Sequence, residues 1–230
     1  MGLHSKFLVH WTGKEFKSDD SKNIVDRLKD NLSHGLYMNT GSEFMIGSNN
    51  TTVTTSVSRV CFTEIRLSQA KNHSDSYGKL GIGFNREFVL ERMGGPVFYV
   101  QNGENGAVVE HFAYLHQHLR SNENQIMVDR LNTIMGFMKN MSVENDSELK
   151  YYEEMEWRII QLKILEDNQL IKVQNKEMGI YRVIFKPEDI ELIVFPNKET
   201  KQLAVQEDFI KHFFKDHLPV IATIDECLNF

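Results

Sequence analysis

The chain has few cysteines and no excess of positive charge. Its 230 residues include only two cysteines, Cys61 and Cys227, which stand far apart and form no CxxC pair. A disulfide framework or a metal site is therefore not expected. The 26 lysines and arginines are outnumbered by 32 aspartates and glutamates, which gives a net charge of −6. Since nucleic-acid binding needs clustered basic residues, the acidic balance argues against a general polyanion binder, although it leaves room for a local basic patch.

Long apolar runs and standard phosphate-binding loops are also missing. No apolar stretch approaches the roughly 20 residues that a transmembrane helix requires, and Met1–Thr12 lacks the pattern of a signal peptide. Neither GxGxxG nor GxxxxGKS/T occurs, because the glycines of 78–83 have the wrong spacing for either loop. We therefore expect a cytoplasmic protein with no membrane segment.

The stretch Arg59–Phe84 is the most informative part of what is present. Residues 60–65 form an apolar run, and residues 80–84 alternate large apolar side chains with glycine, which is the period of a strand with one buried face. The polar residues 69–76 predict a loop between these two strands. Glycine inside a strand suits a place where another group approaches the backbone, so it indicates either a ligand cleft or ordinary sheet packing.

Periodicity and turn residues predict the other elements. Further strands are expected at 6–12, 96–100, 170–173, 179–185, 190–194 and 219–223. Helices are expected at 21–31, 86–93, 107–119, 125–138 and 199–217. The polar segment 41–55 predicts a mobile loop over the cleft or a partly disordered surface segment. Because strands outnumber helices and do not alternate with them strictly, we expect an α+β fold.

Three polar spots interrupt the apolar strands: 10–12, then 61–64 with Tyr77 following, and 153–158. Each has a plain structural explanation. A single strand histidine is usually a satisfied core residue, a strand hydroxyl often bonds a neighbouring backbone group, and three glutamates in four residues suit a solvated rim. The functional alternative is that crowding raises the pKa of one glutamate, as happens with catalytic carboxylates.

Six segments resemble a known family in the same order along the chain. They are VCFTEI, YGKLGIGF, GGPVFYV, YYEEMEWR, PEDIELIVFP and PVIATIDE, and the similarity extends from His10 to Asp225. These segments resemble the AbiGi family of abortive-infection phage-resistance proteins, which carries the label antitoxin. The resemblance implies a bacterial anti-phage protein with a cognate toxin or antitoxin as partner.

The order of the polar spots resembles a second, broader class. A histidine on the first strand, a hydroxyl or tyrosine mid-chain and a glutamate at the start of a late strand are similar to the ADP-ribosyltransferase fold. This resemblance implies a split mixed or antiparallel β-sheet core with flanking helices, in a single domain over 1–230 with a helical insertion at about 107–139. It also implies that NAD is a substrate and that ADP-ribose is moved to a protein or nucleic-acid target.

The same resemblance implies binding roles for five side chains. His10 and Thr12 would bind the ribose next to nicotinamide, and Thr63 would hold the hydroxyl position on the central strand. Tyr77 would stack on nicotinamide, and Arg158 would meet the pyrophosphate as a bidentate donor. From spacing alone, Tyr77, Thr63 and a residue of the segment 41–55 remain alternatives for the residue that faces the ligand.

The resemblance also implies catalytic roles for two glutamates, with His10 beside them. Glu156 would bind the ribose 2′-hydroxyl and stabilise an oxocarbenium-like transition state. Glu154 would orient or deprotonate the acceptor, and on an extended strand it would share one face with Glu156 and Arg158. Spacing does not separate these two glutamates from Glu153.

Two non-catalytic functions are alternatives to the transferase. One is an antitoxin that neutralises its toxin by binding, a role for which the acidic balance suits a basic partner. The other is a phage-defence sensor that binds a nucleotide without turning it over.

Overall fold

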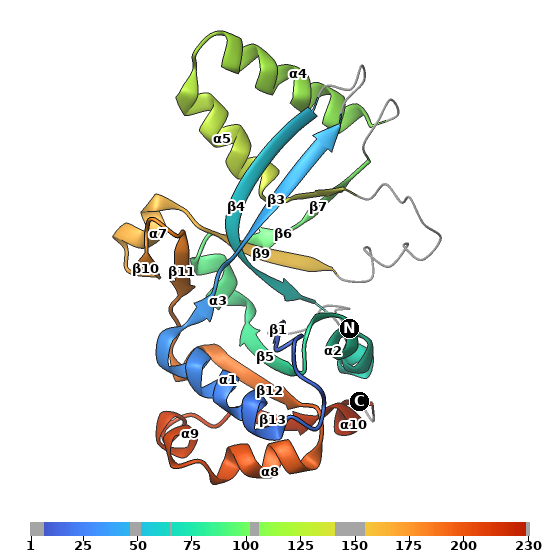
Figure 1. Cartoon of the computed structure of the whole chain (residues 1–230), viewed down its shortest axis with the longest axis vertical. Coiled ribbons are helices and arrows are strands. Elements are labelled where there is room, and N and C mark those ends of the chain that lie inside the picture. The colour runs from blue at the N-terminus through green and yellow to red at the C-terminus, as the bar shows by residue number, and fades with distance from the viewer. Residues whose placement is uncertain (1–6, 47–51, 65, 102–105, 141–154, 229–230) are drawn as a thin grey trace.

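The strands form three sheets in a computed structural model that describes residues 7–46, 52–64, 66–101, 106–140 and 155–228 (Figure 1). The strands are β1 Phe7–Thr12, β2 Leu36–Tyr37, β3 Asn39–Ile46, β4 Thr52–Thr63, β5 Leu80–Asn85, β6 Gly95–Pro96, β7 Phe98–Val100, β8 Met138–Asn140, β9 Glu156–Ile160, β10 Ile171–Asn175, β11 Ile180–Val183, β12 Ile190–Phe195 and β13 Val220–Thr223. The helices are α1 Ser21–His34, α2 Ala70–Tyr77, α3 Arg86–Glu91, α4 Ala107–Ser121, α5 Gln125–Met135, α7 Lys163–Asp167, α8 Lys198–Gln206, α9 Asp208–Phe213 and α10 Ile224–Cys227, with short 3₁₀ turns at Leu67–Gln69 and Pro187–Asp189.

The largest sheet has the order β13-β12-β5-β1-β4-β9-β6, with β3 paired to β4 outside this path. Its pairs are antiparallel apart from β12 and β13, which are parallel. The smaller sheets are β10-β11-β2 and β7-β8. This mixed sheet with helices around it confirms the α+β prediction.

Two strands share one edge of β4 and separate along it. On that edge β3 ends its pairing at Arg59, opposite Asn39, and β1 pairs with Thr63 through Val9. Strand β9 pairs with both Arg59 and Thr63 on the opposite edge. A strand residue has one neighbour on each side, so β1 and β3 must lie on the same side of β4, one beyond the other. The sheet is therefore open between them, at residues 60–62.

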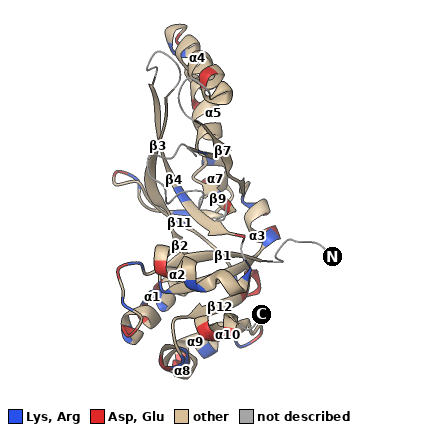
Figure 2. Ribbon diagram, turned by 90° about the vertical axis from the view of Figure 1, so that its right-hand side faces the viewer, with Lys and Arg blue, Asp and Glu red and all other residues tan. Residues whose placement is uncertain are grey.

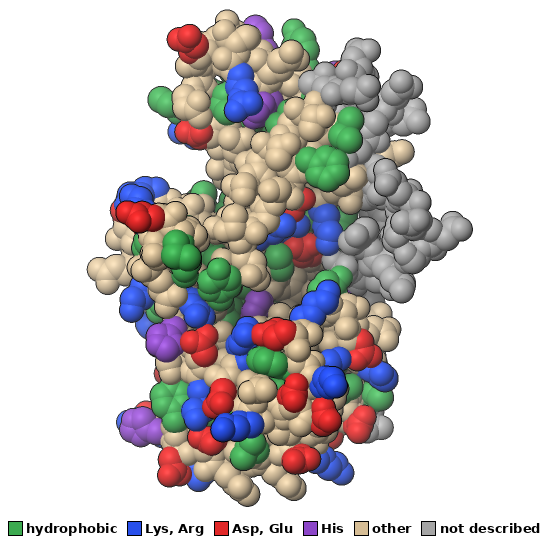
Figure 3. Space-filling view, viewed as in Figure 1, with side chains coloured by type: hydrophobic (Ala, Val, Ile, Leu, Met, Phe, Trp, Pro, Cys, Tyr) green, Lys and Arg blue, Asp and Glu red, His purple; other side chains and the backbone are tan. Residues whose placement is uncertain are grey.

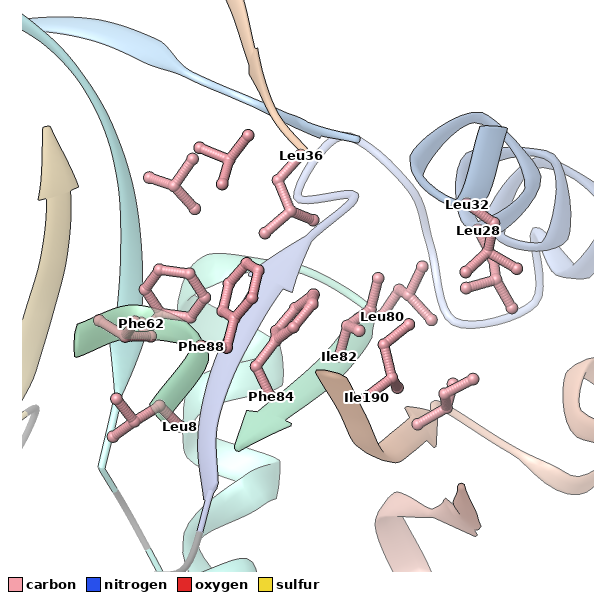
Figure 4. Close-up of a cluster of buried hydrophobic side chains, with 14 of the residues drawn as sticks. Leu8, Leu28, Leu32, Leu36, Phe62, Leu80, Ile82, Phe84, Phe88 and Ile190 are labelled. Atoms are coloured by element: carbon pink, nitrogen blue, oxygen red, sulfur yellow. The ribbon is translucent and has the colours of Figure 1, made fainter. Parts of the chain in front are cut away.

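The main core lies on the α1 face of the sheet (Figure 4). Ile24, Leu28 and Leu32 recur at helical spacing on α1 and are buried against strand residues that include Ile82 and Phe84. The helix extends three residues past the predicted 21–31 and ends where Gly35 takes a positive φ of 88°, which glycine adopts at little cost.

The opposite face of the sheet has its own apolar cluster. Val9 and Trp11 of β1 are buried there with Leu192 and Val194 of β12, whereas Leu8 belongs to the α1 side. This arrangement confirms the strand predicted at 6–12, and the alternation of an extended strand places successive side chains of β1 in opposite layers.

Helices α4 and α5 form a lobe at the end of the long strands β3 and β4, far from α8 and α9 (Figures 1 and 2). A third apolar cluster holds the lobe to the strands; it includes Met45, Val53, Phe112, Met135 and Met138. The lobe spans the predicted helical insertion, but α5 ends at Met135 and the chain continues into β8.

Three of the predicted elements were wrong. The described residues of 41–55 belong to strands β3 and β4 and do not form the predicted loop. Threonine and valine favour an extended backbone, and here this preference outweighs the polarity of the segment. Residues 69–76 are mostly helix α2, which buries Ala70, His73 and Ser74 at helical spacing. The strands predicted at 60–65 and 80–84 are present as parts of β4 and β5, and β1 lies between them in the sheet. The helix at 199–217 is two helices, separated at Glu207, whose φ of −65° and ψ of 120° are extended.

Sheet packing accounts for the glycines of β5. A Cβ atom on Gly81 would lie 2.9 Å from the ring of Trp11, and one on Gly83 would lie 2.9 Å from Cβ of Leu192. These glycines therefore make room for side chains of neighbouring strands, and they do not mark a ligand cleft.

We expect Gly83→Ala to lower the free energy of unfolding by about 1–3 kcal/mol, because the added methyl group overpacks a position where Leu192 has no room to yield. Urea denaturation would measure the change. Gly95→Ala is the matched control, since a Cβ there meets no atom within 4 Å. Equal stability of the two variants would contradict the packing explanation.

Candidate functional site

A cavity of about 470 Å³ lies where β1 and β3 separate. In Figure 3 the surface is hollowed between the upper lobe and the body, and histidine, basic and acidic side chains gather in the hollow. The cavity is lined by Val9, His10 and Trp11 of β1, Asn39, Gly41, Ser42 and Glu43 of β3, Arg59, Cys61 and Thr63 of β4, Glu156 and Arg158 of β9, Lys139 of β8, and Tyr77. We call it the inner cavity.

A chain of ion pairs crosses one wall of the inner cavity. Glu156 accepts from Lys139 Nζ at 2.9 Å and from Arg158 Nε at 2.7 Å. Glu43 Oε1 lies 3.0 Å from Arg158 Nη1 and 3.0 Å from Arg59 Nη2. Among the described residues, three cations therefore share two carboxylates along this wall.

The same contacts fix the protonation states of Glu156 and Cys61. Burial pushes the pKa of Glu156 upward, but the attraction of Arg158 and Lys139 outweighs burial and lowers that pKa to about 2. Burial, together with the nearby Glu156 charge, raises the pKa of the Cys61 thiol to about 12. Near neutral pH Glu156 is an anion with little basicity, and Cys61 is a protonated thiol with little nucleophilic character.

His10 closes the gap in the sheet. Its Nδ1 lies 2.9 Å from the backbone carbonyl of Cys61, which stands in the part of the β4 edge that neither β1 nor β3 pairs. A carbonyl oxygen only accepts, so Nδ1 carries the proton and Nε2 keeps a lone pair. Burial is the main cause that lowers the pKa of His10, which therefore stays neutral near pH 7. The ring stabilises the split and also offers an acceptor.

The hydroxyl groups are partly engaged by the protein. Thr63 Oγ1 accepts from Trp11 Nε1 at 3.2 Å and donates to the Val9 carbonyl at 3.3 Å. Thr12 Oγ1 accepts from Arg27 Nη1 at 3.3 Å. These bonds support the structural explanation of the strand hydroxyls, since each holds β1 to an adjacent element.

A second cavity of about 790 Å³, the outer cavity, lies beside α1. It shares His10, Trp11, Asn39 and Tyr77 with the inner cavity, so the two are parts of one cleft. The rest of its lining is Thr12, Gly13, Lys14, Glu15, Phe16, Asn23, Asp26, Arg27, Asp30, Asn31, Tyr37 and Arg182.

The cleft brings together all of the predicted site residues that the structure describes. His10, Thr63, Tyr77, Glu156 and Arg158 line the inner cavity, and His10, Tyr77 and Thr12 line the outer one. Glu153 and Glu154 lie outside the described residues. The binding and catalytic roles given to these side chains stay predictions.

The surroundings of Arg158 favour a positioning role over a pyrophosphate contact. The side chain is only 2% exposed, and Nη1 also donates to the carbonyls of Gly136 at 2.8 Å and Met138 at 3.3 Å. Its guanidinium therefore ties β9 to the end of α5 and the start of β8 while it holds Glu156 in place.

Sequence reasoning missed several charged residues of the cleft. Glu43 and Arg59 pair across β3 and β4, and Lys139 comes from β8, where a helix end was predicted. Arg27 and Arg182 reach the outer cavity from α1 and β11. An extended alternation in 39–43, with Asn39, Gly41 and Glu43 on one face, was the signal that could have placed Glu43 in the site.

The described residues contain neither a metal-binding cluster nor a membrane-spanning helix. No three His, Cys, Asp or Glu side chains gather there in a way that could hold a metal ion. No helix in that part of the chain is both long and apolar enough to cross a membrane.

Comparison with known proteins gives one match. The family model described as "Putative abortive phage resistance protein AbiGi, antitoxin" matches residues 36–196, which is most of the chain. The matched range includes β3, β4, the lobe and β9 but leaves out β1, so the resemblance expected from His10 to Asp225 is confirmed over this part. A search of curated proteins found no match, and neither did a search of solved structures.

We expect Glu156→Gln to be less stable than the parent protein at pH 7 by about 3 kcal/mol, because it removes the negative charge that lies between buried Arg158 and partly buried Lys139. A carboxylate whose pKa is lowered from 4.5 to about 2 stabilises the fold above pH 4.5, and this stabilisation is lost as the pH falls toward 2. The stability difference should therefore shrink below pH 4.5.

Urea denaturation at a series of pH values would measure this difference. Glu191→Gln, at an exposed position of β12, is the matched control and should follow the parent protein at every pH. A Glu156→Gln difference that stays constant between pH 7 and pH 3 would refute the ionised state of Glu156.

Proposed function

The chain belongs to the AbiGi family, and on that premise we propose that it acts in phage defence as the partner-binding, antitoxin-type component of an abortive-infection pair. The observation that carries this proposal is the family match over 36–196, whose description names an antitoxin. An antitoxin of this kind neutralises a toxin by binding, so it needs an exposed surface for a protein partner.

The lobe offers such a surface. Large apolar side chains stand out from α4 and α5, among them Val108, Tyr114 and Leu115 on α4 and Ile126 on α5, with 48–71% of each side chain exposed. Exposed apolar side chains that gather on one element are typical of protein–protein interfaces. The net charge of −6 would in addition attract a basic partner.

We expect co-expression with the toxin encoded by its operon neighbour to restore growth, because the lobe covers the toxin. The double variant Tyr114→Asp, Ile126→Asp should fail to restore it, since two desolvated charges would oppose binding. Leu218→Asp is the matched control, because Leu218 is 80% exposed but lies outside the lobe. Growth and co-purification are the two measurements.

Failure of the parent chain to relieve the toxicity of its neighbour would exclude the antitoxin role. If the double variant relieves toxicity as well as the parent chain does, the partner interface lies outside the lobe.

ADP-ribosyl transfer from NAD to a macromolecule is the second candidate, and one specific observation favours it. The cleft gathers the anion Glu156 with His10, Thr63 and Tyr77 in one cavity. An ionised carboxylate would stabilise an oxocarbenium-like centre, and Nε2 of the neutral His10 would accept from a ribose hydroxyl. Because Lys139 and Arg158 already neutralise Glu156, this candidate ranks second.

We expect, if transfer occurs, that labelled NAD incubated with host lysate puts label into one of the protein, RNA or DNA fractions. Glu156→Gln should lower this label about 10²–10³-fold, because one preorganised electrostatic contact is lost. His10→Ala should also lower it, whereas Glu191→Gln should not. Absence of both label and NAD loss, with and without phage components, would exclude the transferase. Overexpression separates the two functions further, because a transferase toxin arrests growth and an antitoxin does not.

A further inference from the structure

The outer cavity holds basic and aromatic side chains to which neither proposed function assigns a role. Arg27 of α1 lies over the ring of Phe16, 5.5 Å from its centroid, and Arg182 of β11 lies over Tyr37 at 5.3 Å. The four residues line the same cavity. Each guanidinium is thus held against an aromatic face, an arrangement that reduces the entropy it would lose on binding an anion.

Both guanidinium groups keep donors for a ligand. Arg27 donates from Nη1 to Thr12 and from Nη2 to Glu15. Arg182 donates from Nε to Gln174 and from Nη1 to Asp30 and the Gly35 carbonyl. Within the described part of the chain, Nε of Arg27 and Nη2 of Arg182 make no hydrogen bond. Two fixed cations with remaining N–H groups are suited to a phosphate group.

A buried amide in the same wall lacks a partner. Asn31 of α1 is only 3% exposed, lines the outer cavity, and its Nδ2 has no hydrogen bond to any described residue. An unsatisfied buried donor costs the folded protein free energy. Because this nitrogen is itself inaccessible to solvent, it lies behind the cavity wall, and a ligand oxygen in the cavity would reach it only after a change of the Asn31 rotamer.

Aromatic rings and an acceptor stand along the same cleft. Tyr37 is 40% exposed and Tyr77 is 38% exposed, so each residue packs partly against the protein and is partly accessible from the cleft. Tyr77 stands in the wall that the two cavities share, together with His10, whose Nε2 accepts hydrogen bonds. A planar ring against Tyr77 and a hydroxyl toward His10 would fit this wall.

The charge of the cleft differs from that of the chain. Its lining includes six lysines and arginines, namely Lys14, Arg27, Arg59, Lys139, Arg158 and Arg182, against the five carboxylates of Glu15, Asp26, Asp30, Glu43 and Glu156. Among these lining residues the one extra cation belongs to the inner cavity. The outer cavity is balanced, with three cations against three carboxylates, in a protein of net charge −6. The two volumes of the cleft, about 790 and 470 Å³, lie in the range of small-molecule sites.

We propose that the outer cavity binds a nucleotide, with Arg27 and Arg182 on its phosphate, its ribose toward His10 and its base against Tyr77. The proposal extends the second candidate function to residues outside the inner cavity, but it requires only binding. It therefore holds for a transferase and equally for a partner-binding protein whose cleft senses a nucleotide.

The test is calorimetric titration of the purified full chain with AMP, adenosine and inorganic phosphate. AMP should bind more tightly than either of its parts, because ring and phosphate contacts add. Arg27→Gln and Arg182→Gln should each weaken AMP binding about tenfold or more, since hydrogen bonds to charged groups are strong. Tyr77→Leu should weaken AMP and adenosine alike. Arg120→Gln, on the exposed surface of α4, is the matched control and should bind AMP as the parent does.

Three results would overturn the proposal: no heat of binding with AMP, phosphate binding as tight as AMP binding, or AMP affinity unchanged in both arginine variants. Circular dichroism checks each fold, and Arg182→Lys keeps the ion pair with Asp30 in case Arg182→Gln unfolds. The titration uses neither NAD turnover nor a toxin. AMP binding without labelled product would support this proposal and exclude the transferase. Label transfer together with unchanged AMP affinity in both arginine variants would support the transferase and exclude this proposal.

Discussion

The separation of β1 and β3 along one edge of β4 is the constraint on which the rest of the structure depends. Where two strands leave the same edge, backbone groups of the central strand lose their partners, and buried backbone groups without partners are costly. The Nδ1–H of His10 answers this need at the Cys61 carbonyl. The opening that remains becomes the inner cavity. A structural requirement thus fixes the tautomer of His10, a neutral acceptor in the wall that the two cavities share, so the structural and functional explanations of His10 are compatible.

The ion pairs around Arg158 join the cleft to the lobe. Its guanidinium contacts Glu156 of the sheet, Glu43 of β3 and the carbonyls of Gly136 and Met138 at the base of the lobe. Removing one member would leave a buried charge unpaired, which is far more costly than the pair itself is stabilising. The network therefore gives the lobe a defined position on the sheet. It also means that one wall of the inner cavity and the attachment of the lobe depend on the same side chains.

Much of the fold and part of the site could be predicted because their signals are local. The apolar spacing of α1, the alternation of β1 and the cap of Asn85, which accepts from the Phe88 amide at 2.7 Å, are all short-range features. The loop predictions for 41–55 and 69–76 were wrong because they relied on polarity. In 41–55 the β-propensity of the residues decides the structure, and in 69–76 a narrow buried face makes the segment helical. Glu156 and His10 were found as polar interruptions of apolar strands. Glu43 and Lys139 were not, since their roles arise from contacts between distant strands.

The sequence alone determined the α+β class, the family, the faces of β1 and a short set of polar residues, since these depend on composition and on spacing within single elements. Only the tertiary structure decided that β1 lies between β4 and β5 in the sheet. It also decided that the glycines of β5 accommodate Trp11 and Leu192, and that Glu156 pairs with Lys139 of β8 as well as with Arg158 of its own strand. The physical reason is that strand order and charge pairing are long-range properties: they follow from which edges meet in space, and no periodicity along one segment encodes them.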